Sequence, residues 1–457
     1  MQSIKDYHKL MQNPSYQPGG SSGFTATADP LSDASVCLRD AILMQQLGVN
    51  TIRVYNLDAN LDHNECASIF DAAGIYMLID VNNGLYGNSL DRADPASTYN
   101  LAYMQHVFGV VEAFAPFPNT LGFFGGNEII NQNSSADAPA YIRAVVRDMK
   151  EYIHYNTRAV PVGYSAADVS TLLQDTWEYL SCSLSNDTYS KLDFFGLNDY
   201  EWCGDSSFTQ SGYNTLATMF GSASIPVFFS EYGCNNVEPR TFTNVPVLYG
   251  PEMSVLSGGL VYEYSQDVND YGLVVINSSS EVTLRSDYNY FQQQLAGLGL
   301  SSLTSANKSA EAATPTSCSP SLITDGAMIN SWDIPARPSG VDAAVTSGIA
   351  SPNRGSLVVM NANNNTAQQA SVYNVSGAKI TGEKLVILDD DTSNSPGLVN
   401  SYSASSGAGT APTSTGARPA VAGASSTSTS SPKKGEAAAQ GVNGALGLAA
   451  LAAAFMM

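Results

Sequence analysis

Two glutamates close apolar runs and could act together as a catalytic pair. Glu128 follows residues 121–127 (LGFFGGN), and Glu231 follows residues 227–230 (VFFS). Two carboxylates about 5 Å apart across a sugar can cleave a glycosidic bond with retention, because one protonates the leaving oxygen while the other attacks the anomeric carbon. Asn127 could hold the sugar 2-hydroxyl, and a tyrosine hydrogen-bonded to Glu231 would keep that carboxylate ionised. We therefore interpret the pair as the centre of a retaining carbohydrate-active enzyme.

Either glutamate alone could equally be an ordinary charged residue that closes a strand, so the neighbouring residues matter. Aromatic side chains gather at the ends of several apolar runs, and sugar C–H faces pack well on aromatic rings. These aromatic residues are Tyr55, Tyr200, Trp202, Tyr232, Tyr262 and Tyr264. Their position at polar strand ends favours sugar contacts over a purely structural role.

Other catalytic chemistries lack their motifs in this sequence. The four histidines show no HExxH or clustered Cys/His spacing, so we expect no metal site. No GxSxG elbow occurs, and residues 122–126 lack the Lys–Ser/Thr of a phosphate-binding loop. No full GxGxxG opens a helix, and we therefore expect no cofactor.

The elements that must position the pair are short β-rich runs that alternate with helical patterns. The runs are residues 51–55, 75–81, 121–128, 160–165, 193–198, 226–232 and 259–264. Helical patterns lie between them, for example at residues 35–47, 138–154 and 288–298. Apolar runs of this length separated by helices predict a parallel sheet that is buried on both faces.

Seven βα repeats are one short of a (β/α)8 barrel, and a doubly wound sheet is the competing architecture. Polar residues end many different runs, which is how a barrel builds its site. They are Tyr55, Asp80, Asn127, Glu128, Asn198, Tyr200, Glu231 and Tyr262. We therefore predict an α/β fold, a (β/α)8 TIM barrel, over residues 1–309. Its first strand should precede Tyr16, where no β run is recognisable, so we expect this strand to be truncated.

The C-terminal third changes composition three times. We expect residues 310–395 to form a small β-rich or partly ordered extension, with β candidates at 355–360 (GSLVVM) and 370–388. Residues 396–441 are rich in Ser, Thr, Ala and Gly and predict a disordered stalk. The apolar tail at 442–457 would span only about 24 Å, short of a membrane core of about 30 Å. It fits a GPI-attachment signal, the alternative being a fortuitous Ala-rich helix.

Composition indicates a secreted glycoprotein. The net charge of −21 excludes a nucleic-acid partner, which would need clustered Lys and Arg. Six cysteines without a CxxC pair accompany six Asn-x-Ser/Thr sequons. The sequons are at Asn133, Asn186, Asn277, Asn307, Asn364 and Asn374. Residues 1–13 show no signal peptide, and we expect it to be missing from this sequence. We place the protein on the extracellular face of the plasma membrane, GPI-anchored, and in the cell wall.

Several ordered motifs resemble one family. Residues 124–131 (FGGNEIIN), 198–204 (NDYEWCG), 230–235 (SEYGCN) and 258–266 (GGLVYEYSQ) look like the fungal β-1,3-glucanosyltransferases of glycoside hydrolase family 72. Residues 52–55 (IRVY), 62–66 (DHNEC) and 162–168 (VGYSAAD) add to this resemblance, which covers about residues 16–318. No Cys-rich glucan-binding module follows Cys318 in this sequence, which therefore resembles the family's shorter members.

The resemblance implies roles for individual residues. Glu128 would be the acid/base and Glu231 the nucleophile that transfers a β-1,3-glucan fragment to a second glucan chain. Asp168 would lie on the acceptor side. The other implied glucan contacts are Gln17, Tyr55, Asp80, Asn127, Asn198, Tyr200 and Tyr262. The implied disulfides are Cys37–Cys66, Cys182–Cys318 and Cys203–Cys234.

One departure from the family concerns the acceptor. An Arg is usual five residues after the acceptor-side Asp, but Leu173 stands there. How well a second glucan competes with water is thus open. Two alternatives to transfer follow: an endo-β-1,3-glucanase that only hydrolyses, or a wall glucan-binding protein without turnover. We expect a monomer.

Overall fold

The computed structural model describes residues 11–20, 23–25, 27–135, 137–277, 280–298, 313–326, 328–360, 370–390 and 392–399. The apolar tail and nearly all of the stalk lie outside these residues, so the GPI signal remains a prediction. The described residues fall in one compact unit, although the sequence suggests a boundary at 309/310. None of the described helices is long and apolar enough to cross a membrane.

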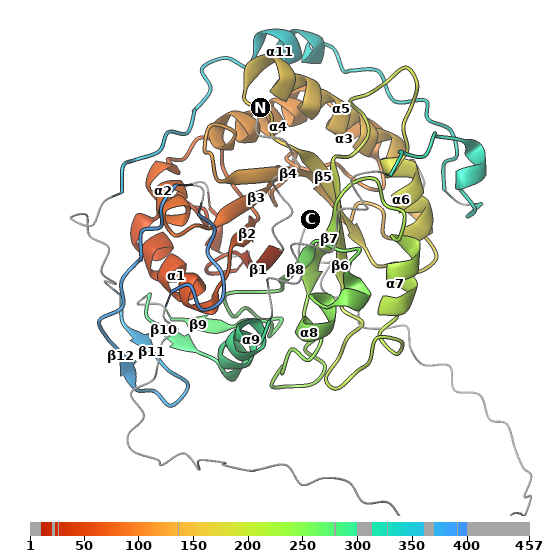
Figure 1. Ribbon diagram of the computed structural model, residues 1–457. Helices are drawn as coiled ribbons and strands as arrows, with labels where there is room; N and C mark the ends of the chain where they lie inside the picture. The colour runs from red at the N-terminus through yellow and green to blue at the C-terminus, as the bar shows by residue number, and fades with distance from the viewer. Residues whose placement is uncertain are drawn as a thin grey trace, which may run out of the picture. The chain divides into compact units, whose positions relative to one another are not determined.

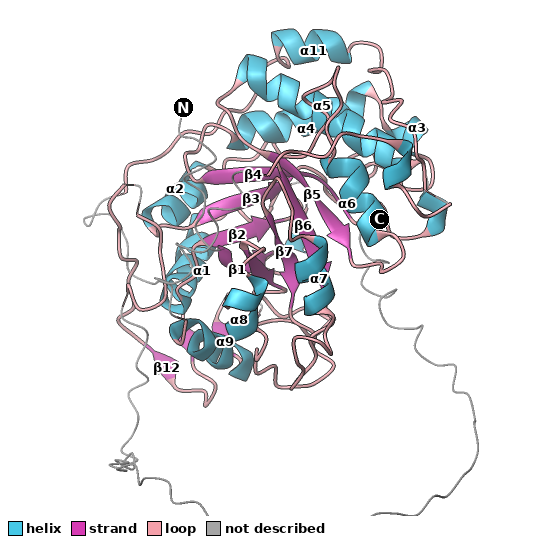
Figure 2. Ribbon diagram, turned by 45° about the vertical axis from the view of Figure 1, so that its right-hand side comes forward, coloured by secondary structure: helices cyan, strands magenta, loops and turns pink. Residues whose placement is uncertain are grey.

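Eight parallel strands close into a barrel in chain order, as predicted (Figures 1 and 2). The strands are β1 Met11–Tyr16, β2 Thr51–Val54, β3 Tyr76–Asp80, β4 Thr120–Asn127, β5 Val162–Ala167, β6 Phe194–Asp199, β7 Val227–Tyr232 and β8 Gly258–Val261. The ring of helices comprises α1 Ala34–Leu47, α2 Asn64–Ala72, α3 Pro95–Thr98, α4 Leu101–Phe114, α5 Ala138–Asn156, α6 Leu173–Ser181, α7 Tyr213–Met219, α8 Val245–Leu248 and α9 Ser286–Ala296. Short 3-10 turns are η3 Asn133–Ser135, η4 Pro251–Met253 and η6 Pro320–Leu322.

The expectation that the first strand is truncated was wrong. Strand β1 pairs with β8 through residues 11–14 and with β2 through Ser15 and Tyr16, and so closes the barrel. Its sequence, MQNPSY, gives no β signal, since Pro lacks a backbone N–H and Asn is depleted in strands. The strand is held by its two neighbours instead of by its own propensity.

An apolar layer fills the barrel beneath the site. Its members come from five strands: Leu78, Phe124, Phe194, Phe228 and Leu260. Gly163 on β5 leaves room for this layer, because a Cβ there would stand 2.3 Å from the ring of Phe194. The filled interior gives the polar side chains above it a rigid, close-packed apolar floor.

The predicted C-terminal extension wraps around the helices. Thr324 and Asp325 donate backbone N–H groups to Asp175 in the first turn of α6, and Arg337 pairs with Asp148 of α5. Helix α11 (Val341–Ser347) packs on α5. Figure 1 shows the chain then continuing past α4 and α2 toward α1. Only β11 (Val372–Tyr373) and β12 (Lys379–Ile380) are strands in this described stretch, and they join β9 (Val274–Ile276) and β10 (Val282–Leu284) in a four-stranded sheet.

The predicted strand at residues 355–360 does not form. This segment lies extended against α2, where Asn64 accepts from the backbone N–H of Ser356 and Ser68 accepts from that of Val358. These backbone N–H groups are satisfied by side chains of α2 instead of by a neighbouring strand. The segment is therefore extended without being part of a β-sheet.

Three disulfides close loops in the unit. They join Cys37 to Cys66, Cys182 to Cys318 and Cys203 to Cys234, the pairs that the family resemblance implied. The second ties the start of the wrapping extension to the end of α6 across 136 residues of sequence.

Candidate active site

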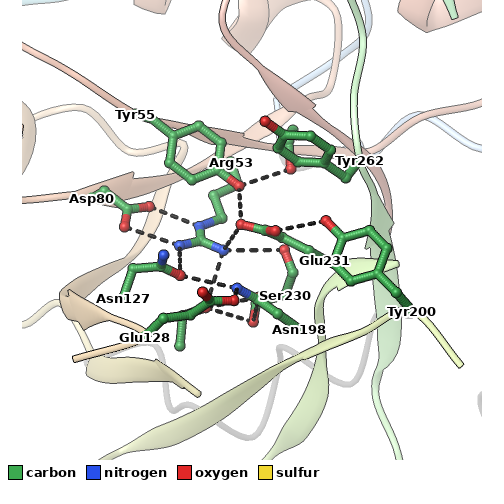
Figure 3. A network of polar contacts seen from close by, with 12 residues as sticks. Arg53, Tyr55, Asp80, Asn127, Glu128, Asn198, Tyr200, Ser230, Glu231 and Tyr262 are labelled. Atoms are coloured by element: carbon green, nitrogen blue, oxygen red, sulfur yellow. Dashed lines mark hydrogen bonds and ion pairs between the residues drawn. The ribbon is translucent and has the colours of Figure 1, made fainter. Parts of the chain in front are cut away.

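Glu128 and Glu231 approach each other at the C-terminal mouth of the barrel (Figure 3). Glu128 directly follows β4, and Glu231 lies in β7, which ends one residue later at Tyr232. Glu128 has a φ of 48°, an uncommon left-handed conformation for a residue with a side chain. Such local strain is concentrated at functional sites, where the surrounding structure holds it in place.

Two tyrosines hold the carboxylate of Glu231 from opposite sides. The hydroxyl of Tyr55 donates to Oε1 over 2.8 Å, and that of Tyr200 donates to Oε2 over 2.7 Å. Burial raises the pKa of Glu231 to about 7, with a smaller contribution from the charge of Glu128, while Arg53 and the two hydroxyls act against this rise. The tyrosines therefore favour the ionised form that a nucleophile needs.

An arginine that sequence reasoning missed connects the site. Arg53 of β2 is fully buried and donates to both oxygens of Asp80, over 2.8 and 3.0 Å. It also donates to Glu231 Oε1 over 3.2 Å and to Asn127 Oδ1 over 2.9 Å. Its guanidinium lies 4.4 Å from the ring centroid of Phe124, in the apolar layer below. The only signal in the sequence was a charge inside the apolar run TIRVY.

A second amide orients the other glutamate. Asn198 of β6 donates from Nδ2 to Glu128 Oε1 over 2.8 Å. Its own Oδ1 accepts from the hydroxyls of Ser165 and Ser230, over 2.9 and 2.8 Å, which fixes the direction of the amide. These two serines were also missed, because a serine inside a strand carries no distinctive signal.

The structure gathers most of the predicted site residues but not all of them. One hydrogen-bonded network contains Tyr55, Asp80, Asn127, Glu128, Asn198, Tyr200 and Glu231. Tyr262 joins it by an edge contact with Tyr200, ring centroids 6.3 Å apart. Gln17 directly follows β1 and Asp168 directly follows β5, but neither joins this hydrogen-bonded network. Burial, with the charge of Glu201, raises the pKa of Asp168 to about 6.

Three aromatics proposed as sugar contacts belong to the core instead. Tyr232 and Tyr264 are fully buried, and Trp202 is 7% exposed and donates its indole N–H to Thr243. Tyr232 follows the inward-facing Glu231, and neighbouring strand residues point to opposite faces. Tyr264 is directed at α1, where its hydroxyl donates to Asp40. Leu173, at the position where the family usually has an Arg, is also buried in the core.

The acid limb of the pH profile should report Glu231, and Tyr200→Phe tests this assignment. Because the Tyr200 hydroxyl stabilises the ionised carboxylate, its removal raises the pKa of Glu231 and moves the acid limb of kcat/KM to higher pH, by roughly half to one unit. Tyr155→Phe, on the outer helix α5, serves as the control with an unchanged profile. A lower rate at an unmoved acid limb would contradict the assignment.

Glu263, beyond the end of β8, should make stability depend on pH. It is 3% exposed, its Oε1 has no hydrogen-bond partner among the described residues, and burial raises its pKa to about 8. Between pH 4.5 and 8 the folded protein keeps this proton and the unfolded chain releases it, so stability falls as pH rises through that window. Glu263→Gln should therefore stabilise by roughly 2–4 kcal/mol at pH 8 and by little at pH 4.5, as thermal unfolding at both pH values would show. An equal gain in stability at both pH values would show that Glu263 is not the source of this pH dependence.

A (β/α)8 barrel with two glutamates converging from β4 and β7 on one polar mouth defines a class of protein, the retaining carbohydrate-active enzymes. Residues 2–298 match the glycoside hydrolase family 72 model, described as "Glucanosyltransferase". The chain belongs to this family.

Individual relatives agree with the family match. The chain is 55% identical over 390 residues to "1,3-beta-glucanosyltransferase gel2" of Aspergillus fumigatus, covering 85% of this chain and 81% of the relative. It is 46% identical over 361 residues to "Probable 1,3-beta-glucanosyltransferase GAS3" of Saccharomyces cerevisiae, covering 75% and 68%. The structure of S. cerevisiae Gas2p in complex with laminaritriose and laminaritetraose gives a TM-score of 0.64 at 34% identity, covering 74% of each chain.

Proposed function

We propose that this protein is a 1,3-β-glucanosyltransferase that cleaves a β-1,3-glucan and transfers one fragment to another β-1,3-glucan chain through a covalent glycosyl-enzyme. The observation that carries the proposal is the unequal environment of the two glutamates. Glu231 is buried and receives hydrogen bonds from Tyr55, Tyr200 and Arg53. Glu128, by contrast, is partly exposed and receives one from the Asn198 amide.

The geometry supports two chemical steps. In the first, a Glu231 oxygen attacks the anomeric carbon, the bond from that carbon to the glycosidic oxygen breaks, and Glu128 gives its proton to the leaving oxygen. In the second, the Glu128 carboxylate takes a proton from an acceptor hydroxyl, whose oxygen attacks the same carbon and releases Glu231. Asn127 and Asn198, which are hydrogen-bonded to each other beside Glu128, would hold the sugar at the reacting carbon.

Product length tests the proposal. The purified protein is incubated with reduced laminari-oligosaccharides of a single length, and the products are separated by size. Products longer than the substrate are expected, because transfer to a second glucan extends it. Only shorter products would indicate an endo-β-1,3-glucanase, and an unchanged substrate would indicate a glucan-binding protein without turnover.

We further propose that the protein acts as a GPI-anchored monomer at the outer face of the plasma membrane and in the cell wall. Three disulfides and the exposed sequon residues Asn133, Asn186 and Asn277 support an extracellular location. A single copy of the chain supplies every residue of the catalytic network, so the proposed chemistry does not require an oligomer. Release of the protein from intact cells by a GPI-specific phospholipase would be the expected result.

A further inference from the structure

A tyrosine is fully solvent-exposed in the turn that follows β3. Tyr86 has a relative exposure of 107%, and its neighbour Leu85 is 46% exposed. An aromatic ring in this setting contributes nothing to the core, although its face remains able to pack on the C–H face of a sugar.

The turn that carries Tyr86 is held in place by hydrogen bonds to asparagines. Asn83, which is 6% exposed, accepts through Oδ1 from the backbone N–H of Leu85 and from Asn88 Nδ2, each over 3.0 Å. The Asn83 backbone N–H in turn donates to the carbonyl of Asn88 over 3.3 Å. Fixing the turn in advance lowers the entropy that a bound ligand would otherwise cost.

The same turn is tied to the rim of the catalytic site. Asn83 Nδ2 donates to the carbonyl of Leu57 over 3.0 Å, and Gly84 N–H donates to Asn56 Oδ1 over 2.8 Å. Asn56 directly follows Tyr55, which donates to Glu231. Tyr86 also lies six residues after Asp80, at most about 20 Å of extended chain. A polysaccharide leaving the site over β2 and β3 therefore comes within reach of the ring.

We propose that the turn at residues 82–88 forms a distal subsite in which Tyr86 stacks on a sugar of the donor β-1,3-glucan, well removed from the cleaved bond. This inference rests on the proposed function and adds a determinant of donor length to it. The acceptor is expected beside Asp168, after β5, so the part of the glucan that runs over β2 and β3 belongs to the donor. Leu85 extends the apolar surface next to the ring.

The test compares donors of increasing length. For Tyr86→Ala, kcat/KM on the longest reduced laminari-oligosaccharides should fall roughly two- to tenfold, while the shortest donor that is cleaved should react as before. Tyr86→Phe keeps the ring and should behave as wild type. Tyr155→Ala is the matched control, because Tyr155 is 58% exposed near the end of α5, which leads to the opposite end of the barrel.

A second measurement separates binding from turnover. In the Glu231→Gln background, Tyr86→Ala should raise the Kd for a long laminari-oligosaccharide by about the factor by which it lowers kcat/KM. The Kd for a short laminari-oligosaccharide should not change. An equal loss at all lengths, no loss at any length, or a change confined to acceptor dependence would overturn the subsite. If the wild-type protein processes no glucan, the proposed function is wrong. If it processes glucan and the effect of Tyr86→Ala does not depend on donor length, only the distal subsite is wrong.

Discussion

Replacing Glu231 with glutamine should leave the barrel folded and lower kcat on laminari-oligosaccharides by more than about a thousandfold. Glutamine has the shape of the glutamate. Its one oxygen can accept from Tyr55 while its NH2 group donates to the Tyr200 oxygen, but the amide cannot form the glycosyl ester. Arg53 keeps its two bonds to Asp80, so the packing of the site survives. The measurement is the initial rate of product formation, with thermal unfolding as the check on folding.

Glu128→Gln provides the matched comparison. With an aryl glucoside donor, whose leaving group needs no proton, this variant should still form the covalent intermediate and then accumulate it, because the second step lacks its base. Intact-protein mass spectrometry should show the glycosyl adduct on Glu128→Gln and not on Glu231→Gln. An adduct on the Glu231 variant, or unchanged oligosaccharide processing by it, would show that this glutamate is not the nucleophile.

The seven strands that sequence reasoning found share a property that β1 lacks. Each is a run of apolar residues buried on both faces, which reads as a strand without any tertiary information. Strand β1 is instead specified by backbone pairing with β2 and β8, which lie far away in sequence. The reverse error occurred at residues 355–360, where strong β propensity meets no strand edge among the residues that the structure describes. Both errors show that pairing with neighbouring strands, more than intrinsic β propensity, determines whether these segments form strands.

The sequence predicted those site residues that are recognisable by their residue type and by their position at the end of an apolar strand. Glu128 and Glu231 were found because carboxylates at the ends of apolar strands are conspicuous. Tyr232 and Tyr264 were misplaced because the face on which a strand-end residue lies depends on register, which composition does not give. Arg53 was missed because its role comes from partners on other strands, including Asp80 and Glu231.

Arg53→Met should be the most disruptive single change outside the glutamate pair. Methionine fills much of the volume but leaves the carboxylate of Asp80 buried without its partner, at a cost of about 3–5 kcal/mol in folding stability. It also removes the positive charge that lowers the pKa of Glu231. We expect kcat to fall at least about a hundredfold, and the acid limb of kcat/KM to move to higher pH.

The double variant Arg53→Met with Asp80→Asn separates stability from function. Asparagine at position 80 removes the unpaired charge, so most of the lost stability should return, as judged by Tm and denaturant unfolding. Activity should not return with it, because Glu231 and Asn127 still lack the guanidinium that holds them. Recovery of both together would mean that Arg53 acts only through folding. Recovery of stability alone, with the acid limb still displaced relative to that of Asp80→Asn alone, would establish Arg53 as the residue that positions the nucleophile.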